Sequence, residues 1–373
     1  MDGDNNKIGN NRSGNKQSGD RRGPQRWRFP RGGRCCPGTT ATMRPRQQRP
    51  VGRRGFLKSG LGLVVGAVSF PGMAACTASP GPAKVTVAGG EAGGFYLEFA
   101  TLLAESLQHH GIAQRAEALT TGGSLDNMKR LVAGEATFAV ALLDAAAQQA
   151  GVQQAAGQAA GAMVAVGKVY ENYVHCLVRR DSGIGNYRGL TGNRIGIGEA
   201  GSGTSLTTHR ILEVSGLAGS SRAVTKVNLG LNDGLAALRR KAVDVLFWSG
   251  GVPTAAIADA NDEPGLRLLD LSSLVPPLRE RFGAFYDRVL IPGSGYPGAG
   301  SVWTVGVANL LLCRNDLDGS VVRNTVRLLV DHADELVPRS SLGVQFLSPD
   351  TLINTADLPL HPAAAEAYRT LHG

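Results

Sequence analysis

The chain has 373 residues, of which 42% are hydrophobic and 18% are charged, and its formal net charge is +9. The positive charge belongs to the start of the chain. Residues 1–60 hold 15 of the 39 basic and 3 of the 30 acidic residues, so residues 61–373 hold 24 and 27. This slightly acidic remainder gives no reason to expect nucleic acid or an anionic membrane surface as a partner.

Residues 1–52 are rich in Arg, Gly, Asn and Gln and contain almost no aliphatic side chains. Such a segment cannot bury enough apolar surface to offset the entropy cost of ordering, so we expect it to be disordered. A signal peptide has its basic segment near the start of the chain, and a start at Met43 would provide this. Residues 1–42 are therefore expected to be a start-site artefact, with a basic arm that binds nucleic acid as the alternative.

Residues 53–75 predict an export signal. Arg53 and Arg54 form a twin-arginine pair, and the apolar run that ends at Phe70 is too short for a membrane span of about 20 residues. Two alanines precede Cys76, an arrangement similar to a bacterial lipobox. We expect cleavage before Cys76, acylation of its thiol, and anchoring on the extracytoplasmic face of the cytoplasmic membrane. The alternative is a secretory signal with an incidental cysteine, and the choice between Tat and Sec export stays open.

The remaining 298 residues alternate strands with helices, which predicts an α/β fold with a mostly parallel sheet. After a tether at 76–83, we expect lobe 1 at 84–180, lobe 2 at 181–295, and a return to lobe 1 with C-terminal helices at 296–373. Strands are expected at 84–88, 114–118, 137–142, 163–166, 173–179, 194–198, 225–228, 244–248, 266–269 and 301–313. Helices are expected at 95–109, 124–132, 205–214, 233–240, 253–259 and 319–336, with a small-residue helix or loop at 145–162.

Two cysteines, Cys176 and Cys313, lie in apolar stretches of the mature chain. They are expected to be buried thiols, with a disulfide as the alternative in an oxidising compartment. No spacing of Cys and His predicts a metal site, so no metal ligand and no cofactor are assigned, and whether the cleft needs a metal stays open.

Four glycine-rich turns, at 93–96, 121–124, 201–205 and 248–253, lead from strands into helices. Backbone N–H groups at a helix N-terminus attract anions, and glycine allows a ligand to come close. Any one of these turns could be purely structural, because turns commonly use Gly and Ser. Since all four lie on the same edge of their βα units, they predict a cleft between the lobes for a small anionic or zwitterionic molecule.

These motifs resemble the TAXI family, the solute receptors of tripartite ATP-independent periplasmic (TRAP) transporters. The resemblance implies a type II-like, two-lobed periplasmic-binding-protein fold that closes over its solute. It also implies a membrane permease, driven by an ion gradient, as the partner. The segments that carry it are 87–96, 121–128, 133–140, 201–205, 244–253, 291–298, 302–311 and 360–368.

The resemblance also implies the ligand contacts. Hydroxyls of Ser202 and Thr204 would hold a carboxylate, and Tyr96 and Trp248 would wall the cleft with one polar tip each. Tyr96 could equally be a core aromatic residue. The full set of expected contacts is Gly94, Phe95, Tyr96, Ser124, Ser202, Gly203, Thr204, Ser205, Trp248 and Gly251.

We therefore expect a monomeric solute receptor that captures a small carboxylate, such as glutamate, another amino acid or a dicarboxylate, and delivers it to a TRAP permease. The alternatives are a lipoprotein that presents ligand to a membrane sensor and an exported hydrolase. The hydrolase has little support, because the chain has no Gly-x-Ser-x-Gly motif and its seven histidines are scattered.

Overall fold

The computed structural model describes residues 81–155, 163–219, 223–261 and 265–372. The expected leader, export signal and Cys76 lie outside these residues. Within them, ten strands form one mixed sheet in the order β2-β1-β3-β10-β4-β7-β5-β6, with β8 paired to β4 and β9 paired to β10. The strands are β1 Val85–Ala88, β2 Ala116–Leu119, β3 Phe138–Leu142, β4 Met163–Arg179, β5 Arg194–Gly196, β6 Thr225–Val227, β7 Val245–Gly250, β8 Leu266–Leu268, β9 Tyr286–Ile291 and β10 Val302–Arg314.

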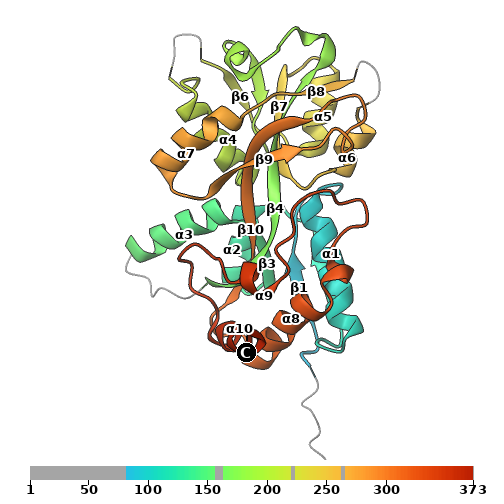
Figure 1. Cartoon of the computed structure of the whole chain (residues 1–373), viewed down its shortest axis with the longest axis vertical. Helices are drawn as coiled ribbons and strands as arrows, with labels where there is room; N and C mark the ends of the chain where they lie inside the picture. The colour runs from blue at the N-terminus through green and yellow to red at the C-terminus, as the bar shows by residue number, and fades with distance from the viewer. Residues whose placement is uncertain (1–80, 156–162, 220–222, 262–264, 373) are drawn as a thin grey trace, which may run out of the picture. The chain divides into compact units, whose positions relative to one another are not determined.

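Two parallel sets of strands define two lobes. In lobe 1, β1 pairs in parallel with β2 and β3, and in lobe 2, β5 pairs in parallel with β6 and β7. The long strands β4 and β10 pair antiparallel with each other and run through both lobes (Figure 1). One half of β10 pairs with β3 and the other half with β9, while the second half of β4 pairs with β7.

Strand β4 differs from the expectation of two separate strands at 163–166 and 173–179. It is continuous over 17 residues, about 56 Å at roughly 3.3 Å per residue, which is long enough to connect the lobes. The polar residues Lys168, Glu171 and Asn172 interrupt its apolar pattern, and only Lys168 is not fully buried. The strand continues through them because it is covered on both faces.

Helices α1, α2 and α3 follow the strands of lobe 1, and α4, α5 and α6 follow those of lobe 2. In α1, Phe95, Phe99, Leu103 and Leu107 are all buried, and their spacing of four residues places them on one face of the helix. The helices are α1 Phe95–His109, α2 Ser124–Val132, α3 Leu143–Ala155, α4 Gly203–Val214, α5 Leu231–Arg239, α6 Ala255–Asp259, α7 Val275–Phe282, α8 Gly319–Asp331, α9 Pro349–Leu352 and α10 Pro362–His372. Short 3₁₀ turns lie at η1 Arg180–Ser182, η2 Tyr187–Leu190, η3 Ser272–Leu274 and η4 Ala333–Leu336.

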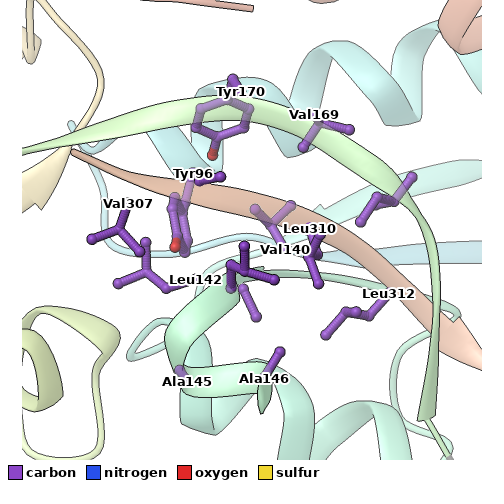
Figure 2. Close-up of a cluster of buried hydrophobic side chains, with 14 of the residues drawn as sticks. Tyr96, Val140, Leu142, Ala145, Ala146, Val169, Tyr170, Val307, Leu310 and Leu312 are labelled. Carbon is purple, nitrogen blue, oxygen red and sulfur yellow. The ribbon is translucent and has the colours of Figure 1, made fainter. Parts of the chain in front are cut away.

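The main core includes both long strands. Figure 2 shows part of it, where Tyr170 of β4 lies near Tyr96 of α1, and Val140 of β3 lies near Leu310 of β10. Burying a side chain as large as leucine stabilises a fold by about 1.5–3 kcal/mol. A second cluster, which includes Leu231, Leu246 and Ile257, belongs to lobe 2.

The predicted α/β fold with two lobes is confirmed by this topology. The expectation of a mostly parallel sheet was wrong, because β4 and β10 pair antiparallel with all their neighbours. Strand β9, Tyr286–Ile291, was not expected, because Asp287 and Arg288 weaken its apolar pattern. Cys176 and Cys313 are buried, free thiols. Among the helices of the described residues, none is long and apolar enough to cross a membrane. The lobe boundaries given above stay predictions.

Candidate ligand pocket between the lobes

The four glycine-rich turns of the sequence meet at one pocket. Lobe 1 contributes two turns to it, which contain Gly94 and Ser124, and lobe 2 contributes the two turns that contain Ser202 and Trp248. The cavity has a volume of about 20 Å³, enough for about one water molecule. The lobes are therefore nearly closed on each other. The lining residues are Gly90, Glu91, Gly94, Tyr96, Gly122, Gly123, Ser124, Leu142, Ser202, Gly203, Thr204, Trp248 and Ser249.

Three helices begin at this pocket. The first residues of α1, α2 and α4 are Phe95, Ser124 and Gly203. Amides in the first turn of a helix have no partner within the helix, and each helix carries a partial positive charge of roughly 0.5 elementary units at its N-terminus. Gly123 has a φ of +100°, and this left-handed backbone, which favours glycine, forms the turn before α2. The three helix N-termini therefore favour an anion at this end of the pocket.

The hydroxyl of Ser124 makes its hydrogen bonds within lobe 1. It accepts a hydrogen bond from Leu142 N (3.1 Å) and lies 3.3 Å from the Tyr96 hydroxyl. Tyr96 donates to Asn309 Oδ1 at 2.5 Å, so Ser124 is the donor toward Tyr96. Ser124 does not cap α2 with its side chain, because the N-cap residue is Gly123. Tyr96 is a buried core aromatic that also borders the pocket, and burial strongly raises its pKa.

The hydroxyls of lobe 2 have different roles. Ser202 is the N-cap of α4, and its Oγ accepts from Ser205 N at 3.0 Å. Thr204 Oγ1 accepts from Ser249 N at 3.2 Å, a bond that leaves the hydroxyl hydrogen free to be donated. Ser205 is buried and does not line the pocket. Thr204 is thus placed to donate a hydrogen bond to a ligand.

Two aromatic residues of the predicted site, Trp248 and Phe95, contact the opposite lobe. The Trp248 ring of lobe 2 packs against Gly94 of lobe 1, where a β-carbon would lie 3.1 Å from Cζ2, and its Nε1 donates to Thr254. Phe95 and Gly251 do not line the pocket. They face each other across the lobes, and any β-carbon on Gly251 would overlap the Phe95 ring. The expected contacts are therefore near each other, but Phe95, Ser205 and Gly251 lie outside the pocket lining.

The sequence analysis missed one lining residue that carries charge, Glu91. Its Oε2 accepts a hydrogen bond of 2.7 Å from Leu231 N, the first residue of α5 in lobe 2. Burial raises the pKa of Glu91, the bond from Leu231 lowers it, and Glu199 and Asp233 raise it further. Because 140 residues separate Glu91 from Leu231, local sequence gave no signal of this contact.

A second contact that the sequence analysis missed joins the lobes beside the pocket. Asp144 of α3 is fully buried and faces Arg210 of α4. Asp144 Oδ2 accepts from Arg210 Nη1 at 3.0 Å, from Thr207 Oγ1 at 3.1 Å and from Tyr286 Oη at 3.0 Å. Three donors from lobe 2 thus converge on one carboxylate oxygen of lobe 1.

Several solved structures are similar to this chain at low identity. The alkanesulfonate-binding protein SsuA from Xanthomonas axonopodis pv. citri, bound to MOPS, is 18% identical, with 78% of this chain and 85% of that chain covered and a TM-score of 0.41. The periplasmic aliphatic sulphonate binding protein SsuA from Escherichia coli is 16% identical, with 77% and 79% covered and a TM-score of 0.39. A substrate binding protein of an amino acid ABC transporter is 13% identical, with 68% and 95% covered and a TM-score of 0.40.

A protein-family model gives the assignment. The model described as the NMT1-like family matches residues 87–370. This range contains all the described strands and helices apart from the first two residues of β1 and the last two residues of α10. The match spans most of the 373 residues. The chain belongs to the NMT1-like family.

Proposed function

We propose that the chain is an extracytoplasmic receptor that captures a small carboxylate-bearing metabolite between its lobes and delivers it to a TRAP-type secondary transporter. The observation that carries this proposal is that α1, α2 and α4 all begin at one pocket lined by both lobes. A carboxylate there would accept hydrogen bonds from first-turn amides and from Thr204.

Glu91 narrows the class of solute. Its carboxyl group lines the same pocket as the three helix N-termini. A purely anionic solute would be repelled by an ionised Glu91, whereas an amino acid could direct its ammonium group to Glu91 and its carboxylate to the helices. We therefore favour an amino acid, glutamate included, over a dicarboxylate.

Binding requires the lobes to separate. A cavity of about 20 Å³ cannot admit an amino acid, so the solute would enter an open form and stabilise a closed one. The shift toward the closed form can be no larger than the difference between the solute's affinities for the two forms. The long strands β4 and β10 join the lobes and are the segments that would bend.

The residue types in the pocket favour binding over catalysis. The thirteen lining residues offer hydroxyls, amides, one indole and one carboxyl group, and none of them is His, Cys or Lys. A nucleophile activated by a neighbouring base therefore has no counterpart among them. The chain is proposed as a binding protein and not as an enzyme.

The sequence supports the proposed site of action and the proposed partner. The export signal at 53–75 and Cys76 support a lipid-anchored receptor outside the cytoplasmic membrane. The resemblance to TAXI receptors supports a TRAP permease as partner. A neighbouring gene for a polytopic permease would favour this role, and a gene for a membrane kinase would favour sensing. Replacing Cys76 with Ser should release the protein from the membrane fraction.

A thermal-shift screen tests the proposal. The protein is melted with a panel of amino acids, dicarboxylates and sulfonates. A solute at 100 times its Kd should stabilise the protein by about 2.7 kcal/mol through mass action. We expect at least one amino acid to raise the Tm, and expect that Glu91→Gln weakens the effect. A panel in which no carboxylate raises the Tm would count against the proposal, and turnover of an added ester would support the hydrolase alternative.

A further inference from the structure

Three metal-binding side chains lie together at the end of α1 that is remote from the pocket. His110 is the C-cap residue of α1, His332 is the C-cap residue of α8, and Glu335 lies in η4. Their ligand atoms all lie within 4.8 Å of one another. His332 and Glu335 are three residues apart, but His110 is 225 residues from Glu335, so the complete cluster could not be found from local sequence.

The distances fit a tetrahedral ion. Zinc binds nitrogen and oxygen at about 2.0–2.2 Å, so two of its ligand atoms lie roughly 3.3–3.5 Å apart. His110 Nε2 lies 3.0 Å from Glu335 Oε1, and His332 Nδ1 lies 3.4 Å from the same oxygen. The two imidazole rings are stacked at a tilt, with centroids 3.8 Å apart and ring planes 34° apart. An ion could bind all three groups after small side-chain movements.

The surroundings favour a cation. Helices α1 and α8 both end at this cluster, and each helix C-terminus carries a partial negative charge. Ser106 Oγ donates to Glu335 Oε2 at 2.6 Å. Supporting hydrogen bonds of this kind orient metal ligands in proteins.

We infer that His110, His332 and Glu335 form a binding site for one divalent transition-metal ion, with zinc as the best match. Two imidazoles and one carboxylate are a donor set that suits zinc and disfavours magnesium, which prefers oxygen ligands. Glu335 and Ser106 also border a surface groove of about 930 Å³, so water has access to a fourth ligand position. The ion would tie the end of α1 to the segment after α8.

This site is separate from the proposed solute pocket. Helix α1 begins at the pocket with Phe95 and ends at His109, about 21 Å away at roughly 1.5 Å per residue. Zinc binding therefore should not require the solute, and removing zinc should leave solute binding in place. A failure of either proposal can thus be recognised independently of the other.

Calorimetry with zinc chloride tests the site. The full chain, without a histidine tag, is stripped with a chelator and alkylated so that the thiols of Cys35, Cys36 and Cys76 do not bind zinc. We expect one zinc ion per chain and no measurable binding of magnesium. His110→Ala and His332→Ala should lose this binding, and Ser106→Ala should raise the Kd by about 10-fold.

The matched control is His209→Ala, which removes a histidine from α4 in the other lobe. It should bind zinc as the original protein does. Circular dichroism checks that each variant is folded, and His332→Gln replaces His332→Ala if the latter does not fold. Cobalt provides a second readout, since a tetrahedral site with nitrogen ligands gives intense visible absorption that the variants should lack. No binding by the original protein, or equal binding by His110→Ala and His332→Gln, would overturn the inference.

Discussion

Asp144 and Arg210 form a buried ion pair that joins the two lobes. Asp144 is fully buried in lobe 1, the Arg210 side chain of lobe 2 is only 10% exposed, and their nearest atoms are 3.0 Å apart. An exposed ion pair contributes about 0–1 kcal/mol, but leaving one charge buried without its partner costs about 3–5 kcal/mol. If the lobes open, both groups gain access to water. If the lobes open as proposed, this pair would be separated, and it would therefore stabilise the closed form specifically.

Asp144→Asn should weaken solute binding more than it weakens the fold. The change removes the negative charge, so Arg210 would be buried without an ion-pair partner in the closed form. In the open form Arg210 would be in contact with water, and the change should cost little there. We expect the affinity for the solute to fall by about 10- to 100-fold, or roughly 1.4–2.8 kcal/mol, in calorimetry. The matched control is Glu213→Gln, which removes an exposed partner of Arg281 from the same helix. Equal affinities for the two variants would contradict the role of Asp144.

Gly251→Ala should hold the lobes apart. The new methyl group would overlap the ring of Phe95 on the opposite lobe, and that ring cannot move freely because it packs on Tyr170, with centroids 4.9 Å apart. Overpacking of this kind costs about 1–3 kcal/mol. With saturating solute, small-angle X-ray scattering should give a larger radius of gyration for Gly251→Ala than for the original protein.

The control for this prediction is Gly185→Ala. A β-carbon at Gly185 meets no atom within 4 Å among the described residues, so the change should leave both affinity and scattering unaltered. If Gly251→Ala closes on the solute to the same radius as the control, the contact between Phe95 and Gly251 does not limit closure.

Thr204→Val should weaken solute binding while keeping the side-chain volume. The substitution removes the acceptor for Ser249 N and the hydroxyl hydrogen proposed to reach the solute. A hydrogen bond to a charged group contributes about 1.5–3 kcal/mol, so the Kd should rise by at least 10-fold. The same change at Thr325, whose buried hydroxyl bonds within α8, should leave the Kd unchanged. Unchanged affinity in Thr204→Val would place the solute elsewhere.

The titration of Glu171 should lower the free energy of unfolding as the pH rises. Burial raises its pKa to about 8, with Asp287 raising it and Lys168 lowering it. Because the folded-state pKa lies above the ordinary value of about 4.5, the folded protein binds the proton more tightly than the unfolded chain does. Its stabilising contribution is fully present below pH 4.5 and is lost as the pH rises toward 8, by up to about 1.4 kcal/mol per pH unit.

Glu171→Gln mimics the protonated side chain and should remove this part of the pH dependence. Urea unfolding at pH 5, 6, 7 and 8 measures the difference. We expect the free energy of unfolding of the original protein to fall more steeply than that of the variant, with the exposed Glu105→Gln as control. Parallel profiles would show that Glu171 titrates normally in the folded protein.

The sequence was sufficient for the fold class, because most of the strands and helices follow local rules. The buried face of α1 and the glycine turns were readable from spacing alone. Strand β4 was predicted as two pieces because Lys168, Glu171 and Asn172 are polar, and their burial depends on β7 and β10, which are distant in the chain. Strand β9 was missed because its exposed charged residues interrupt the apolar pattern that predicts a strand. Its pairing with β10, which is not visible in the local sequence, defines it.

The candidate site shows the same division between local and distant information. The turns could be found because glycine and serine before a helix have a local meaning. The role of Glu91 depends on Leu231 of the other lobe, and that of Asp144 depends on Arg210. No local pattern contains such pairs. Phe95 and Gly251 were expected as ligand contacts, but they lie against each other outside the pocket lining.

A crystal structure with the tightest-binding amino acid from the thermal-shift screen tests the central claim most directly. We predict the solute carboxylate within hydrogen-bonding distance of first-turn amides of α2 or α4 and of Thr204 Oγ1, and the solute ammonium near Glu91. Electron density for the solute outside this pocket, or a carboxylate that contacts no helix N-terminus, would contradict the account.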